Sequence, residues 1–336
     1  MEKQQRVLTG ITTSGMPHLG NLVGAVLPAI EASNHQNTSS FLFLADYHSL
    51  IKNTDSELTH SSSFEIAACW LACGLDPSKV IFYRQSDIPH IFELAWILGC
   101  LTSKGLLNRA HAYKAAISDN EEKGIKDIDK GVTMGLFNYP ILMAADILMF
   151  SADIVPVGQD QKQHIEMARD IALKFNHHYG ELLTPPEAQI SEVTGVLPGL
   201  DGRKMSKSYN NTIPVFADEK ELKKTIMKIK TNSLEPGDPK DSSECNIFSI
   251  YKAIANEEEI SVLQNQYDEG IGWGEAKKIL FEHLNDFLSP YKKEYSKIIK
   301  DREFVESVLL DGSKKAQEVS RPLIENIRKA VGIKGF

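Results

Sequence analysis

A glycine-rich stretch near the start of the chain has the residue types of a phosphate-binding turn. Gly10, Gly15 and Gly20 punctuate residues 10–21, which follow a short apolar run and lead into an apolar helical pattern. Glycines let the backbone approach a ligand closely, and a new helix offers free N–H groups and a positive dipole end to phosphate. Such turns also serve tight packing alone, so this stretch favours a nucleotide site without establishing one.

A second stretch carries mobile positive charge. Residues 202–208 read Gly-Arg-Lys-Met-Ser-Lys-Ser, which places Lys204 and Lys207 three apart among serines on a polar loop. Two compact ammonium groups on such a loop can neutralise a polyphosphate and withdraw after the reaction. A solvated linker has a similar composition, so the interpretation depends on the rest of the chain.

The elements that must position these residues follow a βαβαβ order. Three short apolar runs are typical of buried parallel strands: 6–8, 41–45 and 80–83. Three stretches have helical patterns: 20–33, 56–73 and 91–100. We expect an α/β fold with a Rossmann-like, doubly wound parallel sheet, in which helices cover both faces and ligands bind beyond the carboxyl ends of the strands.

The second half of the chain has a different character. Residues 184–209 are rich in Pro, Gly, Ser and Lys and predict a long mobile loop. Charged helical patterns follow at 219–230, 260–269 and 273–288. We therefore expect a catalytic domain at 1–190, and at 191–336 the lysine loop with a smaller all-helical domain.

Composition limits the class of protein. The chain has 336 residues, 42% hydrophobic and 24% charged, which predicts an ordinary soluble protein of more than one domain. No apolar run is long enough for a membrane span and the start is polar, so we expect a cytoplasmic location and no membrane partner. The net charge of −8 argues against a nonspecific DNA coat. Cys69 and Cys73 read as a buried helix face, and no residue cluster predicts a dedicated metal site.

The two chemical stretches together resemble a known family. Residues 204–208 spell KMSKS and residues 17–21 resemble HIGH, the two signatures of class I aminoacyl-tRNA synthetases. Asn21 replaces the second histidine of HIGH, which is usual in the tryptophanyl branch. Residues 139–148 and 153–166 resemble the bacterial type of the tryptophanyl-tRNA synthetase family almost residue for residue, and the likeness covers nearly the whole chain.

The resemblance implies a ligase that activates L-tryptophan with ATP to an adenylate, releases pyrophosphate, and transfers tryptophan to the 3′ end of tRNA(Trp) for protein synthesis. The substrate carboxylate attacks the α-phosphate, so the protein must position and neutralise rather than supply a nucleophile. His18 would donate to phosphate, and Lys204 and Lys207 would bind the β- and γ-phosphates. Mg²⁺ would arrive with ATP.

The resemblance also implies the rest of the ATP site. A side chain at Gly158 would block the approach of the sugar to the sheet edge. Thr12 stands where the family commonly has Gln, so only a backbone contact is carried over there. The further residues expected to bind ATP are Thr13, Ser14, Gly20, Asn21, Gln159, Asp160, Leu197, Met205, Ser206 and Ser208.

Tryptophan is distinguished by an indole N–H that can only donate a hydrogen bond. A selective pocket therefore needs a buried acceptor, and Asp146, flanked by apolar residues, is our choice. A desolvated carboxylate left unpaired would reject analogues without the N–H by roughly 10⁴-fold. The remaining pocket residues implied by the resemblance are Met143, Val155 and Val157 as apolar walls, and Tyr139, His48 and Gln161 at the edge.

Partners and alternatives remain open from the sequence. The resemblance implies an anticodon-reading helical domain and a homodimer, and two basic groups of residues could face tRNA phosphates. These groups are Lys223, Lys224, Lys228 and Lys230 on one expected helix, and Lys292, Lys293, Lys297, Lys300 and Arg302. The competing interpretations are a tyrosyl-tRNA synthetase, a related nucleotidyltransferase that acts without tRNA, and a catalytically silent paralogue.

Overall fold

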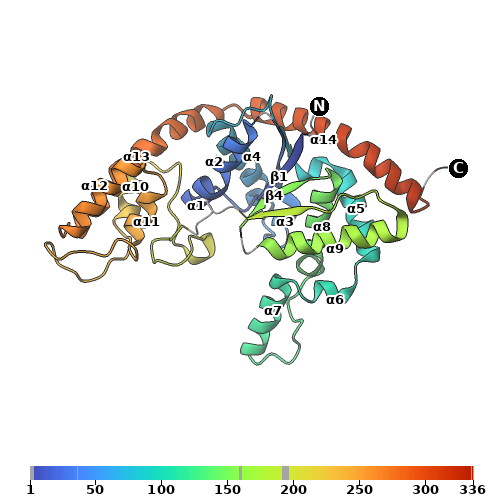
Figure 1. Cartoon of the computed structure of the whole chain (residues 1–336), viewed down its shortest axis with the longest axis horizontal. Helices are drawn as coiled ribbons and strands as arrows, with labels where there is room; N and C mark the ends of the chain where they lie inside the picture. Colours follow the sequence, from blue (N-terminus) through green and yellow to red (C-terminus); the bar gives the residue numbers. More distant parts are fainter. Residues whose placement is uncertain (1–3, 36, 159–160, 191–196, 334, 336) are drawn as a thin grey trace.

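The computed structural model describes residues 4–35, 37–158, 161–190, 197–333 and 335. One parallel sheet of five strands, in the order β3-β2-β1-β4-β5, lies at its centre (Figure 1). The strands are β1 (Gln5–Thr12), β2 (Thr38–Ala45), β3 (Ile81–Arg84), β4 (Ile154–Val157) and β5 (Glu187–Ile190). The strand order reverses between β1 and β4, which makes the carboxyl end of β1 the switch point where such sheets bind ligands.

The predicted α/β class with a doubly wound parallel sheet is confirmed, and the three predicted strands are present with slightly different ends. One local expectation is wrong, because β5 lies inside the stretch 184–209 that was predicted to be a loop. Its backbone is paired in register with β4, from Ile154 opposite Glu187 onward. That pairing satisfies backbone groups which composition alone assigned to solvent.

Alternating side chains of β2 divide the core between the two faces of the sheet. Leu42 and Leu44 join one buried cluster, and Phe41, Phe43 and Ala45 join the other. The first face is covered by α1 (Leu19–Asn21), η1 (Leu22–Val26), α2 (Leu27–Ser33) and α4 (Ser56–Ala72). The second face is covered by α5 (Pro89–Leu101), α8 (Met134–Met149) and α9 (Lys162–Tyr179). The helix expected at 20–33 is thus interrupted by the π-helical η1.

Short elements connect this framework. They are α3 (Asp46–Ser49), η2 (Gln85–Asp87), α6 (Lys104–Leu107), α7 (His111–Glu122) and η4 (Lys207–Tyr209). The helices α3 and η2 directly follow β2 and β3, so both stand at the carboxyl edge of the sheet. α7 projects away from the sheet at the bottom of Figure 1.

The second half of the chain forms the expected smaller group of helices, at the left of Figure 1. They are α10 (Glu219–Ile226), α11 (Asn246–Lys252), α12 (Glu257–Asp268) and α13 (Trp273–Ile298). The expectation that four lysines share one helix is wrong, because α10 ends at Ile226, before Lys228 and Lys230. Lys228 lies in the turn that follows the helix end, and Lys230 lies just beyond that turn.

The last helix, α14 (Arg302–Ala330), was not among the predicted elements. It runs from the helical group back across the sheet domain, along the upper edge of the molecule in Figure 1. It packs on the edge strand β3 so closely that a Cβ atom at Gly312 would lie 1.8 Å from the carbonyl oxygen of Phe82. Ion pairs join Arg84 to Glu306 and Arg328 to Glu93. The domain boundary at residue 190 stays a prediction. The helix α14 lies beyond that boundary in the sequence but packs on the predicted catalytic domain, residues 1–190.

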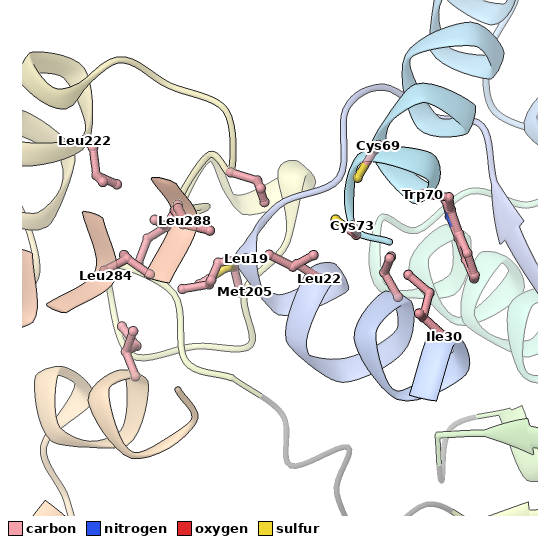
Figure 2. Close-up of a cluster of buried hydrophobic side chains, with 14 of the residues drawn as sticks. Leu19, Leu22, Ile30, Cys69, Trp70, Cys73, Met205, Leu222, Leu284 and Leu288 are labelled. Carbon is pink, nitrogen blue, oxygen red and sulfur yellow. The ribbon is translucent and has the colours of Figure 1, made fainter. Parts of the chain in front are cut away.

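A continuous apolar cluster joins the helical group to the first face of the sheet (Figure 2). Leu284 and Leu288 of α13 lie beside Met205 and Leu19, and the row continues toward Cys69 on α4. The expected burial of Cys69 and Cys73 is confirmed. No described helix is long and apolar enough to cross a membrane.

Candidate active site at the carboxyl end of the sheet

The two predicted chemical stretches line one cavity of about 350 Å³. Its wall includes Gly10, Ser14 and His18 from the first stretch, and Ser206 and Lys207 from the second. The cavity lies beyond β1, at the switch point of the sheet. A larger hollow of about 1020 Å³ lies between α4 and α14 and contains none of the predicted site residues. The chemistry of the side chains, rather than the size of the hollow, therefore locates the site.

His18 caps the amino end of α1, and its ring is held in one tautomer. Its Nδ1 accepts from the backbone N–H of Asn21 at 3.3 Å, and the Asn21 side chain accepts from the His18 N–H at 3.2 Å. Burial, and then the charge of Lys207, lower the pKa of His18 to about 4. The imidazole is therefore neutral at pH 7 with its hydrogen on Nε2, a donor suited to phosphate oxygen. A Cβ atom at Gly20 would lie 3.2 Å from this ring, which explains the glycine.

Lys207 bridges the two stretches. Its ammonium group donates to the carbonyl oxygens of Ser14 at 2.9 Å and Gly15 at 2.7 Å. Much of the residue is exposed, but burial around the ammonium group lowers its pKa. Carbonyl oxygens are weak partners for an ammonium ion, so a polyphosphate in the cavity would compete for it effectively. Lys204 is exposed on the same loop.

Asn211 anchors the KMSKS stretch, and sequence reasoning missed it. Its side chain accepts from the Ser206 N–H at 2.8 Å and donates to Asp201 at 2.7 Å and to the Lys204 carbonyl at 3.1 Å. A hydrogen bond from Asn211 comes first among the causes that lower the pKa of Asp201 to about 2. A lone asparagine after the motif has no pattern that could have identified this role.

Met205 of the motif is buried away from the cavity. It packs in the apolar cluster of Figure 2 and accepts a weak hydrogen bond from the Gly20 N–H through its sulfur at 3.4 Å. Leu197, also expected at the ATP site, accepts from the Met205 N–H at 2.9 Å. Met205 thus ties the lysine loop to α1.

The remaining predicted ATP residues are placed as follows. Thr13 is buried, and its side chain bonds to Ser49 at 3.0 Å. Thr12 and Ser14 line the cavity. The Gly158 carbonyl accepts from the Gln161 N–H at 2.9 Å at the end of β4. The predicted residues Gln159 and Asp160 lie outside the described residues, and Ser206 bonds to Ser208 at 2.8 Å.

Asp146 is the buried acceptor that the sequence predicts. Its carboxylate, only 1% exposed on α8, accepts from Gln85 Nε2 at 2.8 and 3.0 Å and lies 2.9 Å from His48 Nε2. Burial raises the pKa of Asp146, while the contacts with His48 and Gln85 oppose that rise. Gln85 was not predicted, because a single glutamine after a strand belongs to no recognisable motif.

The other predicted pocket residues gather nearby. The Tyr139 hydroxyl contacts His164 Nε2 at 2.5 Å, and His164 Nδ1 contacts Gln161 at 2.9 Å. The rings of Tyr139 and His48 meet edge to face with centroids 6.4 Å apart. Because His48 also contacts Asp146, this series of side-chain contacts reaches the Asp146 carboxylate. The apolar residues Met143, Val155 and Val157 all belong to or pack on the same buried cluster as α8.

Comparison with known proteins agrees with this geometry. The family described as class I tRNA synthetases (W and Y) matches residues 1–289. The tryptophan–tRNA ligase of Neisseria meningitidis is 53% identical over 331 residues, covering 98% of each chain, and that of Pseudomonas putida is 53% identical, covering 98% of this chain and 74% of its own. Tryptophanyl-tRNA synthetase of Campylobacter jejuni, solved with ADP and tryptophan, is 42% identical with a TM-score of 0.87, covering 98% of this chain and 100% of its own.

The agreement extends from the motifs to the whole fold, and the resemblance found in the sequence is confirmed. A match over residues 1–289 includes the turn with His18, the helix with Asp146 and the loop with Lys207. The chain therefore belongs to the class I tRNA synthetases of the tryptophan and tyrosine group.

Proposed function

We infer that this chain is a ligase that activates L-tryptophan with ATP, forming tryptophanyl-adenylate and pyrophosphate, and then transfers tryptophan to the 3′ end of tRNA(Trp). The Asp146 carboxylate supports tryptophan as the amino acid, because it is a buried acceptor that an indole N–H would satisfy. The relatives that are 53% identical over nearly the full chain are named tryptophan–tRNA ligases, which supports the same choice.

Activation forms a bond between a tryptophan carboxylate oxygen and the α-phosphorus, and breaks the bond from that phosphorus to the pyrophosphate oxygen. Negative charge grows on the departing pyrophosphate, so its stabilisation lowers the barrier. Neutral His18 donates Nε2–H to a phosphate oxygen. Lys207 leaves the carbonyls of Ser14 and Gly15 for the phosphates, and Lys204 approaches from the same loop.

The turn and the loop supply the rest of the ATP site in this proposal. Backbone groups of Thr12, Thr13 and Ser14 border the phosphates, with Gly20 and Asn21 behind them. The described residues of the cavity wall include no carboxylate, so Mg²⁺ would be held by the ATP with which it arrives and would help to neutralise the phosphates. The sugar and adenine side is assigned to Gly158, Gln159, Asp160 and Leu197, and the loop side to Ser206 and Ser208, while Met205 holds the loop against α1.

The tryptophan pocket is centred on Asp146, which accepts the indole N–H. Met143, one helical turn earlier, faces the same side of α8, and Tyr139 with His48 closes the edge. Val155, Val157 and Gln161 complete the proposed pocket. A tyrosine hydroxyl can also donate to a carboxylate, so the tyrosyl alternative is disfavoured by the 53% identity to tryptophan–tRNA ligases rather than by the acceptor itself.

The assembly proposed for the chain is a cytoplasmic homodimer. The helical group α10–α13 would read the anticodon, and the exposed lysines around α10 and at the end of α13 would contact tRNA phosphates. The division into residues 1–190 and 191–336 describes the same assignment.

Pyrophosphate exchange with each of the twenty amino acids tests the proposal. Labelled pyrophosphate should enter ATP in the presence of tryptophan alone. Exchange with tyrosine would overturn the specificity, and no exchange at all would support the silent paralogue. Exchange without charging of tRNA would support the nucleotidyltransferase that acts without tRNA.

A further inference from the structure

We propose that Gln85 is a specificity-determining positioning residue, which orients the Asp146 carboxylate so that Oδ1 accepts the indole N–H. The inference rests on the proposed function and deepens it. Gln85 begins η2, directly after β3, and its side chain is fully buried. It belongs to neither signature motif and contacts the pocket only through Asp146 among the contacts of the described residues.

The amide of Gln85 is fixed at both ends. Its Oε1 accepts from the backbone N–H of Tyr47 at 3.2 Å, and its Nε2 donates to both oxygens of Asp146, at 2.8 and 3.0 Å. A flipped amide would place a carbonyl against the carboxylate and an NH₂ against the Tyr47 N–H. The orientation of Gln85 is therefore determined by its neighbours, and it holds the carboxylate from one side.

The two oxygens of Asp146 are consequently inequivalent. Oδ2 has hydrogen bonds with Gln85 and His48, whereas Oδ1 has a hydrogen bond with Gln85 alone among the described residues. A carboxylate oxygen can accept about two hydrogen bonds. Oδ1 therefore keeps an acceptor direction for a ligand, and this direction turns with the carboxylate if Gln85 no longer holds it.

The two anchors of this arrangement come from neighbouring elements at the sheet edge. Tyr47 lies on α3, and Asp46 of the same helix accepts from the hydroxyl and the N–H of Ser86 on η2. The short helices α3 and η2, which follow β2 and β3, are thus bonded directly to each other as well as to α8. This rigid pair is what makes a glutamine at position 85 a fixed donor rather than a mobile one.

A purely structural role for Gln85 predicts a different result from a positioning role. Loss of a structural contact lowers stability and reduces activity toward every substrate alike. Loss of positioning reduces activity only toward a substrate that uses the N–H. The decisive quantity is therefore the ratio of kcat/KM for tryptophan to kcat/KM for its benzothiophene analogue, in which sulfur replaces N–H.

Gln85→Leu removes the donor while keeping a buried side chain of similar size. Hydrogen bonds to charged groups contribute enough for about a 10- to 100-fold effect, so pyrophosphate exchange should lose that factor in kcat/KM for tryptophan. Exchange with the analogue should change less than about threefold. Gln317→Leu is the matched control, because Gln317 donates to the Asp87 carbonyl of the same turn at 2.7 Å. It should leave the ratio unchanged.

Gln85→Glu provides a second, independent test. At neutral pH two carboxylates would face each other, and protonation of the new side chain would restore one donor to Asp146. The tryptophan ratio of this variant should therefore rise as pH falls, relative to the parent at each pH. Asp46, His48 and Tyr83 also surround Asp146, and the parent profile corrects for them.

The outcomes separate the two proposals. If the parent exchanges with tryptophan but both Gln85 variants keep its ratio, the positioning role is refuted and the function stands. If Gln85→Leu weakens both substrates equally, Gln85 is merely structural. If the parent does not exchange with tryptophan at all, the proposed function has failed before the variants are compared.

Discussion

Replacing Asp146 by asparagine tests the specificity pocket at its centre. The change keeps the shape of the side chain, removes the charge, and converts one oxygen into an NH₂ group. Gln85 Nε2 lies 2.8 and 3.0 Å from the two oxygens, so in either orientation the new amide opposes a donor with a donor. One buried donor left unsatisfied costs about 1–3 kcal/mol of stability.

The effect on tryptophan follows from the lost charge. A hydrogen bond to a charged acceptor contributes about 1.5–3 kcal/mol and one to a neutral acceptor about 0.5–1.5 kcal/mol, so the indole bond weakens by about 1 kcal/mol. Since each 1.4 kcal/mol is tenfold, discrimination for tryptophan should fall by about fivefold or more, while ATP binding is spared.

Pyrophosphate exchange measures this effect as the ratio of kcat/KM for tryptophan to that for the benzothiophene analogue. The control is Asp55→Asn, which makes the same chemical change at the N-cap of α4, where asparagine caps a helix as well as aspartate does. This control should leave the ratio unchanged. An unchanged ratio for Asp146→Asn would show that the indole N–H is bound elsewhere and that the pocket assignment is wrong.

Three other changes test separate parts of the structure. Lys207→Ala should lower kcat for exchange by about 100-fold with little change in the Kd for tryptophan, because its phosphate contact matters most in the transition state; equal losses would place it in ground-state binding. The pKa of His18 is lowered from 6.5 to about 4, so the folded state disfavours the charged ring and loses stability as pH falls through that range. In denaturant titrations, the stability of the parent relative to His18→Asn should drop by about 1–2 kcal/mol between pH 6.5 and 4, after allowance for partial exposure. A constant difference would contradict the burial of the ring. Gly312→Ala should destabilise by about 3 kcal/mol because its Cβ would collide with the Phe82 carbonyl, whereas Gly274→Ala, which meets nothing within 4 Å, should not; equal effects would refute the close packing of α14.

Local patterns predicted the central sheet because buried strands are short, apolar and bounded by turns. The runs at 6–8 and 41–45 fall on strands, and the run at 80–83 overlaps β3 in all but its first residue. The strand β5 was not predicted, because its four residues lie in a stretch of loop-like composition and only their pairing with β4 defines a strand. The helix α14 was not predicted. Its role depends on contacts with β3, which is distant in the sequence, and a local pattern carries no information on such contacts.

The candidate site divides in the same way. Motif residues such as His18 and Lys207 were found because the chemistry demands their types at fixed spacing. Gln85 and Asn211 were not, because each acts by holding a motif residue in place, and a buried amide can do so from any segment that folds beside it. Residues of this kind become visible only when the hydrogen bonds are known.

The position of α14 also bears on how the chain is made. Ser313 of α14 bonds to Asp87 beside β3, a contact between residues 226 positions apart. At a synthesis rate of about 5–20 residues per second, the edge of β3 waits roughly 10–45 s for the helix that covers it. During that time the nascent chain presents an uncovered strand edge, which is a template for pairing with other chains. Synthesis of α14 thus ends the period in which the β3 edge of this chain is uncovered.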